Sequence, residues 1–387
     1  MDSIAGRKPA LVWALHFSAL ALVLLWVFPT LGLLASSFRT NDQIRSSGWW
    51  AAAFPAEQTQ TLRTADPDLA RVAAEGGLFV VEGNLFAEAD LSAPGDLLSW
   101  GVSSRDVDAY TPGTRAELAE GEAITVQTNG DYLWQGSAEQ ISGRGQRVFV
   151  TVTVPPSFTL ENYRRVLLDP GNREGMRQAF FNTLTVAIPA TVIPILIAAF
   201  AAYALAWMEF PGRALLVATI VGLLVVPLQL ALIPLLSLHN AIGIGKGYLG
   251  VWLAHTGFGL PLAIYLLRNY MVGLPREIIE CARVDGATDF EIFTRIVLPL
   301  SFPALASFAV FQFLWTWNDL LVAMVFLIDS SGQTTVMTRQ IVELLGTRGG
   351  DWEILATSAF VSIAVPLVVF FTMQRFLVRG LLAGSVK

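Results

Sequence analysis

The stretch Leu274–Pro299, LPREIIECARVDGATDFEIFTRIVLP, decides how this chain is interpreted, because it is a charged island between two strongly apolar regions. Gly286 suits the left-handed conformation that ends a helix. Thr288 and Glu291 have the spacing of a capping box, so a second helix should begin there and close at Pro299. We therefore predict two short helices joined at a glycine corner. Between two membrane spans, such a hairpin lies at the membrane face and can contact a soluble partner.

The composition indicates an integral membrane protein, since 54% of the 387 residues are hydrophobic and only 14% are charged. Six apolar runs are long enough to cross a bilayer. They are residues 11–38, 179–207, 213–237, 247–270, 301–328 and 354–377. The first run exceeds the apolar core of a signal peptide, the competing interpretation, so we read it as an uncleaved anchor. We predict an all-α polytopic membrane protein with six transmembrane helices, the first in residues 1–38 and the other five in residues 179–387.

Residues 39–178 form an insertion between the first two spans, with twelve Lys or Arg against nineteen Asp or Glu. Three stretches rich in β-branched residues are separated by Gly, Asn and Pro. They are residues 77–86, 123–134 and 146–154. We predict a small β-rich extracytoplasmic domain, a sandwich or a barrel, followed by an amphipathic helix over 157–168 with Thr159 as its cap. Trp49 and Trp50 fit an aromatic belt at the membrane interface better than a ligand-stacking pair.

The orientation follows from Lys and Arg in the short loops and the tails. With a cytoplasmic N-terminus, ten of these residues lie inside and three outside. The inside set is Arg7, Lys8, Arg213, Arg268, Arg276, Arg283, Arg295, Arg375, Arg379 and Lys387; the outside set is Lys246, Arg339 and Arg348. We therefore place both termini and the charged hairpin in the cytoplasm and the insertion outside.

Nothing in the sequence predicts catalysis, a metal site or a cofactor site. The lone Cys281 excludes internal disulfides, and the three histidines, His16, His239 and His255, lack the spacing of metal ligands. The glycine-rich loop 240–247 fails as a phosphate-binding loop, because Asn240 takes the place of its first glycine and Gly247 that of its Ser or Thr. The chain is therefore not expected to hydrolyse ATP.

Four polar residues within the apolar runs are costly to bury in hydrocarbon. They are Gln229, Gln312, Asn318 and Asp319. They can line a path for a polar substrate, or they can make hydrogen bonds that hold the helices together. Trp315 and Trp317 could stack on a sugar ring, although packing within the bundle is the simpler account.

The charged stretch resembles the EAA loop of binding-protein-dependent ABC importer permeases, whose form is E-A-A-x3-G-x9-I-x-L-P. Glu280-Cys281-Ala282, Gly286 and Ile296-Val297-Leu298-Pro299 meet every spacing, with Cys281 replacing the second-position alanine. Other segments are similar to the smaller membrane subunit of the maltose-type branch. They are Asp285–Ala287, Trp317–Asp319 and Gln374–Lys387. The resemblance covers about 1–40 and 155–387, and the insertion that opens near Ser47–Trp50 resembles that of the α-glucoside permeases.

The resemblance implies one half of the pathway of an ATP-driven importer in the bacterial inner membrane. Its substrate would be a sugar, an oligosaccharide or an α-glucoside such as maltose or trehalose. The partners would be a second permease, two ATPase subunits that bind Mg-ATP, and an extracytoplasmic binding protein, while this chain binds no cofactor and no nucleic acid. The residues expected at the ATPase are Glu280, Ala282, Gly286, Ala287, Asp289 and Phe290. Glu280 and Asp289 could pair with basic residues, Phe290 could fill an apolar slot, and the tail 380–387 could also reach the ATPase.

Two other functions remain open on the residues alone. A secondary transporter driven by an ion gradient would need matching broken-helix repeats, which we do not find. A membrane-anchored enzyme or sensor would carry its site in residues 39–178, which contain no histidine and no cysteine. The insertion itself could dock the binding protein, brace the sister permease or select substrates.

Overall fold

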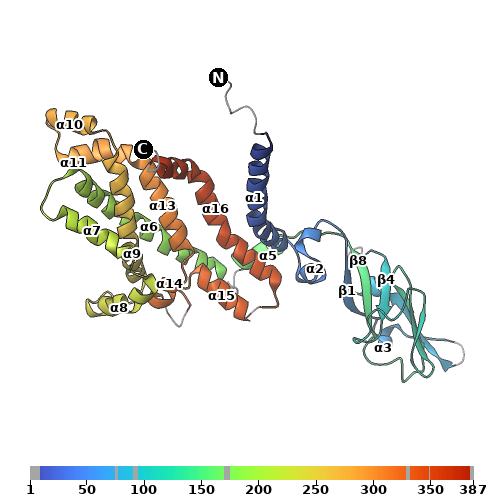
Figure 1. Cartoon of the computed structure of the whole chain (residues 1–387). Coiled ribbons are helices and arrows are strands. Elements are labelled where there is room, and N and C mark those ends of the chain that lie inside the picture. Colours follow the sequence, from blue (N-terminus) through green and yellow to red (C-terminus); the bar gives the residue numbers. More distant parts are fainter. Residues whose placement is uncertain are drawn as a thin grey trace. The chain divides into compact units, whose positions relative to one another are not determined.

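The computed structural model describes residues 9–74, 77–89, 95–169, 175–327, 332–347 and 349–383 (Figure 1). The chain divides into two compact units. The first holds residues 1–162 with Asp351–Ala356, and the second holds Tyr163–Gly350 with the remainder of the chain from Thr357. Each unit is described by itself below.

The first unit begins with α1 (Pro9–Ser37), a 29-residue apolar helix. A short helix α2 (Asn41–Ser46) follows, with a capping box between Thr40 and Gln43. Trp49 lies in a 3-10 turn (Trp49–Ala51) and packs edge-on against Phe28 of α1 at 4.4 Å between ring centroids. Trp49 is thus engaged with the helix, while Trp50 is 69% exposed.

Two antiparallel sheets form the insertion, with strand orders β1-β8-β4 and β2-β3-β7-β6-β5. The strands are β1 (Ala56–Arg63), β2 (Val72–Ala73), β3 (Phe79–Asn84), β4 (Leu97–Gly101), β5 (Arg115–Ala119), β6 (Glu122–Val126), β7 (Asp131–Gly136) and β8 (Arg147–Val154). Two short helices, α3 (Pro67–Ala70) and α4 (Leu85–Glu88), connect them. Both sheets contribute to one apolar core around the fully buried Trp100, so the domain is a β-sandwich.

The predicted β-rich domain is confirmed, with corrections to its elements. The stretch 123–134 is two strands, because Asn129 and Gly130 make the turn between β6 and β7, with Gly130 at φ 85°. The helix predicted over 157–168 begins only at Glu161, as α5 (Glu161–Tyr163) and a π-helical turn (Arg164–Leu168). Thr159 does cap it, since its hydroxyl accepts the N–H of Glu161 at 3.0 Å.

The second unit is a bundle of helices (Figure 1). Its main elements are α6 (Met176–Trp207), α7 (Arg213–Leu223), α8 (Leu228–Ala241), α9 (Tyr248–Val272), α13 (Phe302–Trp317), α14 (Leu321–Phe326), α15 (Met337–Thr347) and α16 (Trp352–Ala383). The short helices α10 (Arg276–Val284) and α11 (Asp289–Ile292) lie at one end of this bundle, and α8, α14 and α15 lie at the other (Figure 1).

Among the described residues, four helices are long and apolar enough to span a membrane: α1, α6, α9 and α16. Two bent pairs raise the number to six if each crosses as one span, so the predicted six spans are an upper bound. The run 213–237 is not one straight helix: α7 and α8 meet at 110°, because Pro227 disfavours a helical residue before it. The run 301–328 also holds two helices, since α13 ends at Trp317 and α14 begins at Leu321.

Small side chains let the helices of the bundle approach closely. Alanine is the most frequent residue on the buried face of α6, which packs against α9 and α13. Its prolines, Pro189 and Pro194, lack the N–H that would bond the carbonyl four residues earlier. The side chains of Trp252 on α9 and Gln312 on α13 donate to those carbonyls instead. Gln312 is one of the predicted site residues.

Candidate functional site

The first helix of the 274–299 segment is α10 (Arg276–Val284), which ends at a glycine corner as predicted. Gly286 has φ 83°, a conformation that glycine adopts without strain. The N–H of Ala287 donates to the carbonyl of Ala282, and the N–H of Gly286 donates to that of Arg283, both at 3.0 Å. These two bonds make a Schellman motif, which fixes the direction in which the chain leaves α10.

The second helix begins at once, with the predicted capping box. The Thr288 hydroxyl accepts the N–H of Glu291, whose carboxylate accepts the N–H of Thr288 at 3.1 Å. The helix continues as α11 (Asp289–Ile292), a π-helical turn (Phe293–Val297) and α12 (Leu298–Leu300). Pro299 therefore does not close the segment, because the wider π turn accommodates it, and the chain bends by 69° into α13 only after Leu300.

One face of this hairpin is buried in the bundle. Ile279 of α10 and Ile292 of α11 are at most 1% exposed, and they join a core with Leu267 of α9 and Ala202 of α6. Ala282 also belongs to this core. Ala282 therefore lies beneath the hairpin rather than on its exposed surface.

The opposite face is exposed and partly apolar. Glu280, Gly286, Asp289 and Phe290 are exposed as predicted, Phe290 by 65%. Ala287 is half-buried. The sequence analysis missed Val284, which is 87% exposed beside the glycine corner. The signal was present, since Val284 lies on the side of α10 away from Ile279.

Hydrogen bonds join the hairpin to the last turns of α6. The hydroxyl of Tyr203 donates to Asp289 Oδ1 at 3.2 Å, and Arg283 Nη2 lies 3.5 Å from the same oxygen. Arg283 Nη2 also donates to the carbonyl of Trp207 at 3.3 Å. Asp289 was predicted to pair with basic residues of the ATPase, and within the chain it already has Tyr203 and Arg283 as partners. Tyr203 was missed, since nothing local links positions 86 residues apart.

The predicted path residues do not form one cluster. Gln229 and Asn318 are exposed, and Asn318 Nδ2 donates to the carbonyl of Leu314 within its own helix. Asp319 is the cap of α14, because its carboxylate accepts the N–H groups of Val322 and Ala323 at 3.0 and 3.2 Å. Its Oδ2 lies 3.7 Å from Nε2 of the buried His255 on α9.

Gln312 makes hydrogen bonds between helices, which was the second of the two roles considered for these polar residues. It is fully buried, and its Nε2 donates to the carbonyl of Ala190 at 3.2 Å. Pro194 cannot bond that carbonyl, so Gln312 of α13 supplies the missing donor to α6. The indole of Trp317 plays the same part on α16, donating at 2.9 Å to the carbonyl of Ser362, four residues before Pro366.

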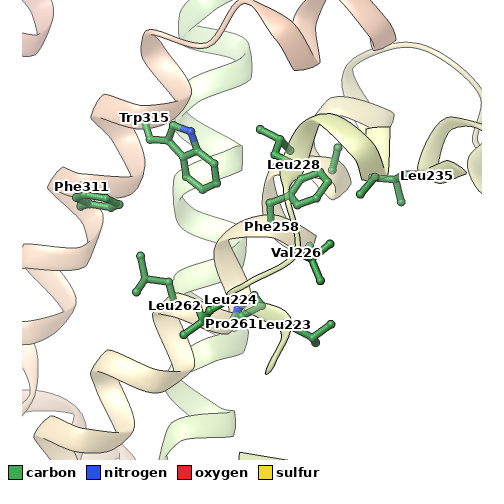
Figure 2. A pocket seen from close by; sticks show the side chains of 13 residues that line it. Leu223, Leu224, Val226, Leu228, Leu235, Phe258, Pro261, Leu262, Phe311 and Trp315 are labelled. Atoms are coloured by element: carbon green, nitrogen blue, oxygen red, sulfur yellow. The ribbon is translucent and has the colours of Figure 1, made fainter. Parts of the chain in front are cut away.

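The bundle contains a hollow of about 510 Å³ with almost wholly apolar walls. Figure 2 shows Trp315 and Phe311 of α13 on one side and the corner between α7 and α8, with Val226 and Leu228, on the other. Phe258, Pro261 and Leu262 of α9 complete it. Of the two tryptophans for which sugar stacking and bundle packing were the alternatives, only Trp315 reaches the hollow, since Trp317 is packed between helices.

Residues 179–382, more than half of the chain, match the family of binding-protein-dependent transport system inner membrane components. The chain belongs to this family. The predicted membership is thus confirmed, and the exposed hairpin at one end of the helical bundle lies within the matched region. The family consists of membrane components of transporters rather than of enzymes.

The chain is also similar in sequence to individual transport permeases, among them the following three. The chain is 58% identical to the alpha-glucoside transport system permease protein AglG of Rhizobium meliloti, over 99% of both chains. It is 58% identical to the osmoprotective compounds uptake permease protein GgtD of Synechocystis, over 59% of this chain and 76% of the relative. It is 32% identical to the trehalose/maltose transport system permease protein MalG of Thermococcus litoralis, over 59% of this chain and 81% of the relative. Only the first of these three matches extends over the insertion as well as the bundle.

Proposed function

We propose that this chain is a permease subunit of an ATP-driven importer for a sugar of the α-glucoside class, and that it forms half of the translocation pathway. The observation that carries the proposal is the hairpin of α10 and α11, whose glycine corner protrudes from one end of an apolar bundle. The match to an α-glucoside permease over 99% of both chains supports the substrate class.

The hairpin end faces the cytoplasm in this proposal, and the insertion faces outward. Four arginines lie in or beside the hairpin: Arg268, Arg276, Arg283 and Arg295. The loop between α8 and α9, at the other end, carries only Lys246. Positive residues accumulate on the cytoplasmic side of membrane proteins, so this distribution supports the proposed orientation, in which both termini are also cytoplasmic.

The hairpin docks on an ATPase subunit that binds Mg-ATP. Phe290 and Val284 offer two exposed apolar side chains near the glycine corner, and Glu280 offers a carboxylate on the same exposed side of α10. An apolar anchor inserted into a pocket supplies most of the affinity of such an interface, and the surrounding charges set orientation and rate of association. Asp289 acts mainly by holding the hairpin in place, because Tyr203 and Arg283 already engage it.

The sugar path lies between this chain and a second permease, and a binding protein delivers the sugar. The apolar hollow beside Trp315 cannot satisfy many sugar hydroxyls by itself, since its walls are almost wholly apolar. The exposed polar groups Gln229 and Asn318, with Asp319, are the contribution of this subunit to the path. Most of the hydrogen bonds to the sugar then come from the second permease.

Co-purification with the ATPase tests this proposal. We expect Phe290→Asp to lose the ATPase during purification, because it places an unpaired charge in an apolar contact. The matched control is Val342→Asp on α15, which changes a 54% exposed apolar residue at the opposite end of the bundle and should retain the ATPase. Gly286→Asp should lose the ATPase or retain it without substrate-stimulated turnover, since φ 83° strains any side chain there.

The proposal would be overturned if the wild-type chain bound no ATPase and uptake instead followed an ion gradient. Sugar uptake in proteoliposomes that contain both permeases, the ATPase and the binding protein decides between the two. Uptake must require ATP on the hairpin side and the binding protein on the other. Omitting either component should abolish it.

A further inference from the structure

Helix α6 makes side-chain hydrogen bonds at both of its ends. At one end it contacts the hairpin, to which it is not directly connected in sequence. The hairpin is connected through the backbone to α9 before it and to α13 after it. Its contact with α6, in contrast, consists of side-chain packing and of polar contacts at Tyr203 and Arg283, and a single substitution can remove one of these polar contacts. This makes α6 the helix whose role can be tested separately from the covalent path.

At the hairpin end, α6 is bonded to both helices of the hairpin. Tyr203 bonds Asp289 at the start of α11, and the Trp207 carbonyl accepts from Arg283 of α10. Tyr203 is only 4% exposed, and its ring packs against Phe293 at 5.2 Å between centroids. A buried hydroxyl that is held by its ring has little freedom to follow its acceptor. Displacement of either hairpin helix therefore pulls on the last turns of α6.

At the opposite end, Asn182 of α6 is 5% exposed and uses both its amide groups. Its Nδ2 donates to the carbonyls of Gln333 at 2.7 Å and Thr335 at 2.9 Å, in the segment before α15. Its Oδ1 accepts from the hydroxyl of Tyr248 at the start of α9, at 2.9 Å. The acceptors in 333–335 are backbone carbonyls, so this part of the chain itself is attached to α6.

The next residue of α6 extends that attachment into α15. Thr183 is 2% exposed, and its hydroxyl accepts the N–H of Met337, the first residue of α15, at 2.9 Å. That N–H is one of those left without a partner at the start of any helix. Helix α15 therefore takes a cap from α6, and the two must move together or lose this bond.

Between its ends, α6 has the length to cross a membrane. Asn182 and Tyr203 are about 32 Å apart along the helix at 1.5 Å per residue, close to the thickness of the hydrocarbon layer. Pro189 and Pro194 interrupt its backbone bonding. Trp252 of α9 donates to the carbonyl of Thr185 at 2.9 Å, and Gln312 donates to that of Ala190, so neighbouring helices support both interruptions.

We propose that α6 carries the displacement of the 274–299 hairpin across the membrane to residues 333–337 and α15, with Tyr203 and Asn182 as the positioning residues at its two ends. This inference rests on the proposed function, in which the ATPase moves the hairpin. It assigns to two residues outside the hairpin the transmission of that movement.

The test uses the complete complex in proteoliposomes, with Tyr203→Phe as the main variant. The matched control is Tyr265→Phe on α9, whose exposed hydroxyl makes no hydrogen bond to any described part of the chain. We expect Tyr203→Phe to keep the ATPase bound and the basal ATP turnover unchanged. The sugar transported per ATP should fall about fivefold, the factor that corresponds to one hydrogen bond of about 1 kcal/mol.

A label on α15 gives a readout that a merely structural role would not move. Cys281 is the only cysteine of the chain, so Cys281→Ser with Leu345→Cys places a single spin label on an exposed position of α15. In the complex, ATP should change the spectrum of this label. Tyr203→Phe and Asn182→Ala should each suppress the change, whereas Tyr265→Phe should preserve it. Asp289→Ala, at an exposed position, removes the acceptor of Tyr203 and should suppress it too.

Two results would overturn the inference, and only the second would also overturn the proposed function. An undiminished spectral change and transport ratio in Tyr203→Phe and Asp289→Ala would show that α6 does not transmit the movement, leaving the proposed function intact. No response to ATP in a complex with the wild-type hairpin and α6 would remove the proposed function together with this inference.

Discussion

Helices α1 and α6 are both long and apolar enough to span a membrane, and they differ in how they pack. In α6, small side chains, alanine and threonine, make up more than half of the buried face. In α1, leucine, valine, phenylalanine and tryptophan side chains are exposed within its unit. Hydropathy thus indicates which segments can span a membrane, whereas side-chain size decides which of them can serve as the packed centre of a bundle.

The largest expected effect comes from enlarging an alanine. Ala202 of α6 is fully buried, so Ala202→Leu should lower the free energy of unfolding by about 1–3 kcal/mol through overpacking. Ala21→Leu, at an exposed position of α1, makes the same chemical change and should have almost no effect on the purified chain. Thermal unfolding in detergent measures both. Equal destabilisation by the two variants would contradict the distinction between the helices.

An intermediate effect should come from the donors that serve the prolines of α6. Gln312→Leu leaves the carbonyl of Ala190 without a partner and should cost about 0.5–2 kcal/mol. Pro194→Ala returns a backbone N–H to that carbonyl, so the cost of Gln312→Leu should shrink in the Pro194→Ala background. The double-mutant cycle is measured by thermal unfolding, with Pro29→Ala in α1 as the control background. The same cost in all three backgrounds would show that Gln312 does not serve Pro194.

The smallest expected effect is on the stability of the β-sandwich, which belongs to the same unit as α1. Hydroxyl groups of Ser99 and Thr151 donate to Asp108 at 2.6 Å each and lower the pKa of this carboxyl group. Because its pKa is lower in the folded state than the ordinary value of about 3.9, the stabilisation is full above that pH and is lost as the pH falls through the folded pKa.

Urea unfolding between pH 6 and pH 3, followed by tryptophan fluorescence, checks this sign. The stability advantage of wild type over Asp108→Ala should decline toward pH 3. The effect is small because Asp108 is exposed. A difference between wild type and Asp108→Ala that grows with acidity would contradict the direction of the pKa shift.

Local signals predicted the hairpin well, because its corner depends on residues close in sequence. Gly286 and the Thr288–Glu291 pair specify two helix ends without help from the rest of the chain. The turn between β6 and β7 carried an equally local signal, Asn129-Gly130, which the stretch 123–134 obscured because both strands are rich in the same residues. Family resemblance then added the site and the partner class.

Tertiary pairings could not be predicted in the same way. Asp319 was identified as costly, but its role as the cap of α14 required knowing that α13 stops at Trp317. Gln312 was identified as polar within a span, yet only the structure shows the proline-interrupted carbonyl that it serves. The bond from Tyr203 to Asp289 joins two helices that the sequence places far apart. In each case the partner, rather than the residue, was missing from the prediction.

The insertion leaves and rejoins the chain as a pair of neighbouring strands. β1 and β8 are paired antiparallel over their whole length, from Ala56 opposite Val154 to Arg63 opposite Arg147. The segments outside this strand pair also meet. Asn162, which follows β8, donates through Nδ2 to the carbonyls of Ser37 and Arg39 at the end of α1, which precedes β1. The entry and exit of the domain are therefore adjacent. Because its entry and exit are neighbouring strands, the whole sandwich occupies a single point of the chain, and a short linker can take its place between the end of α1 and the start of α5.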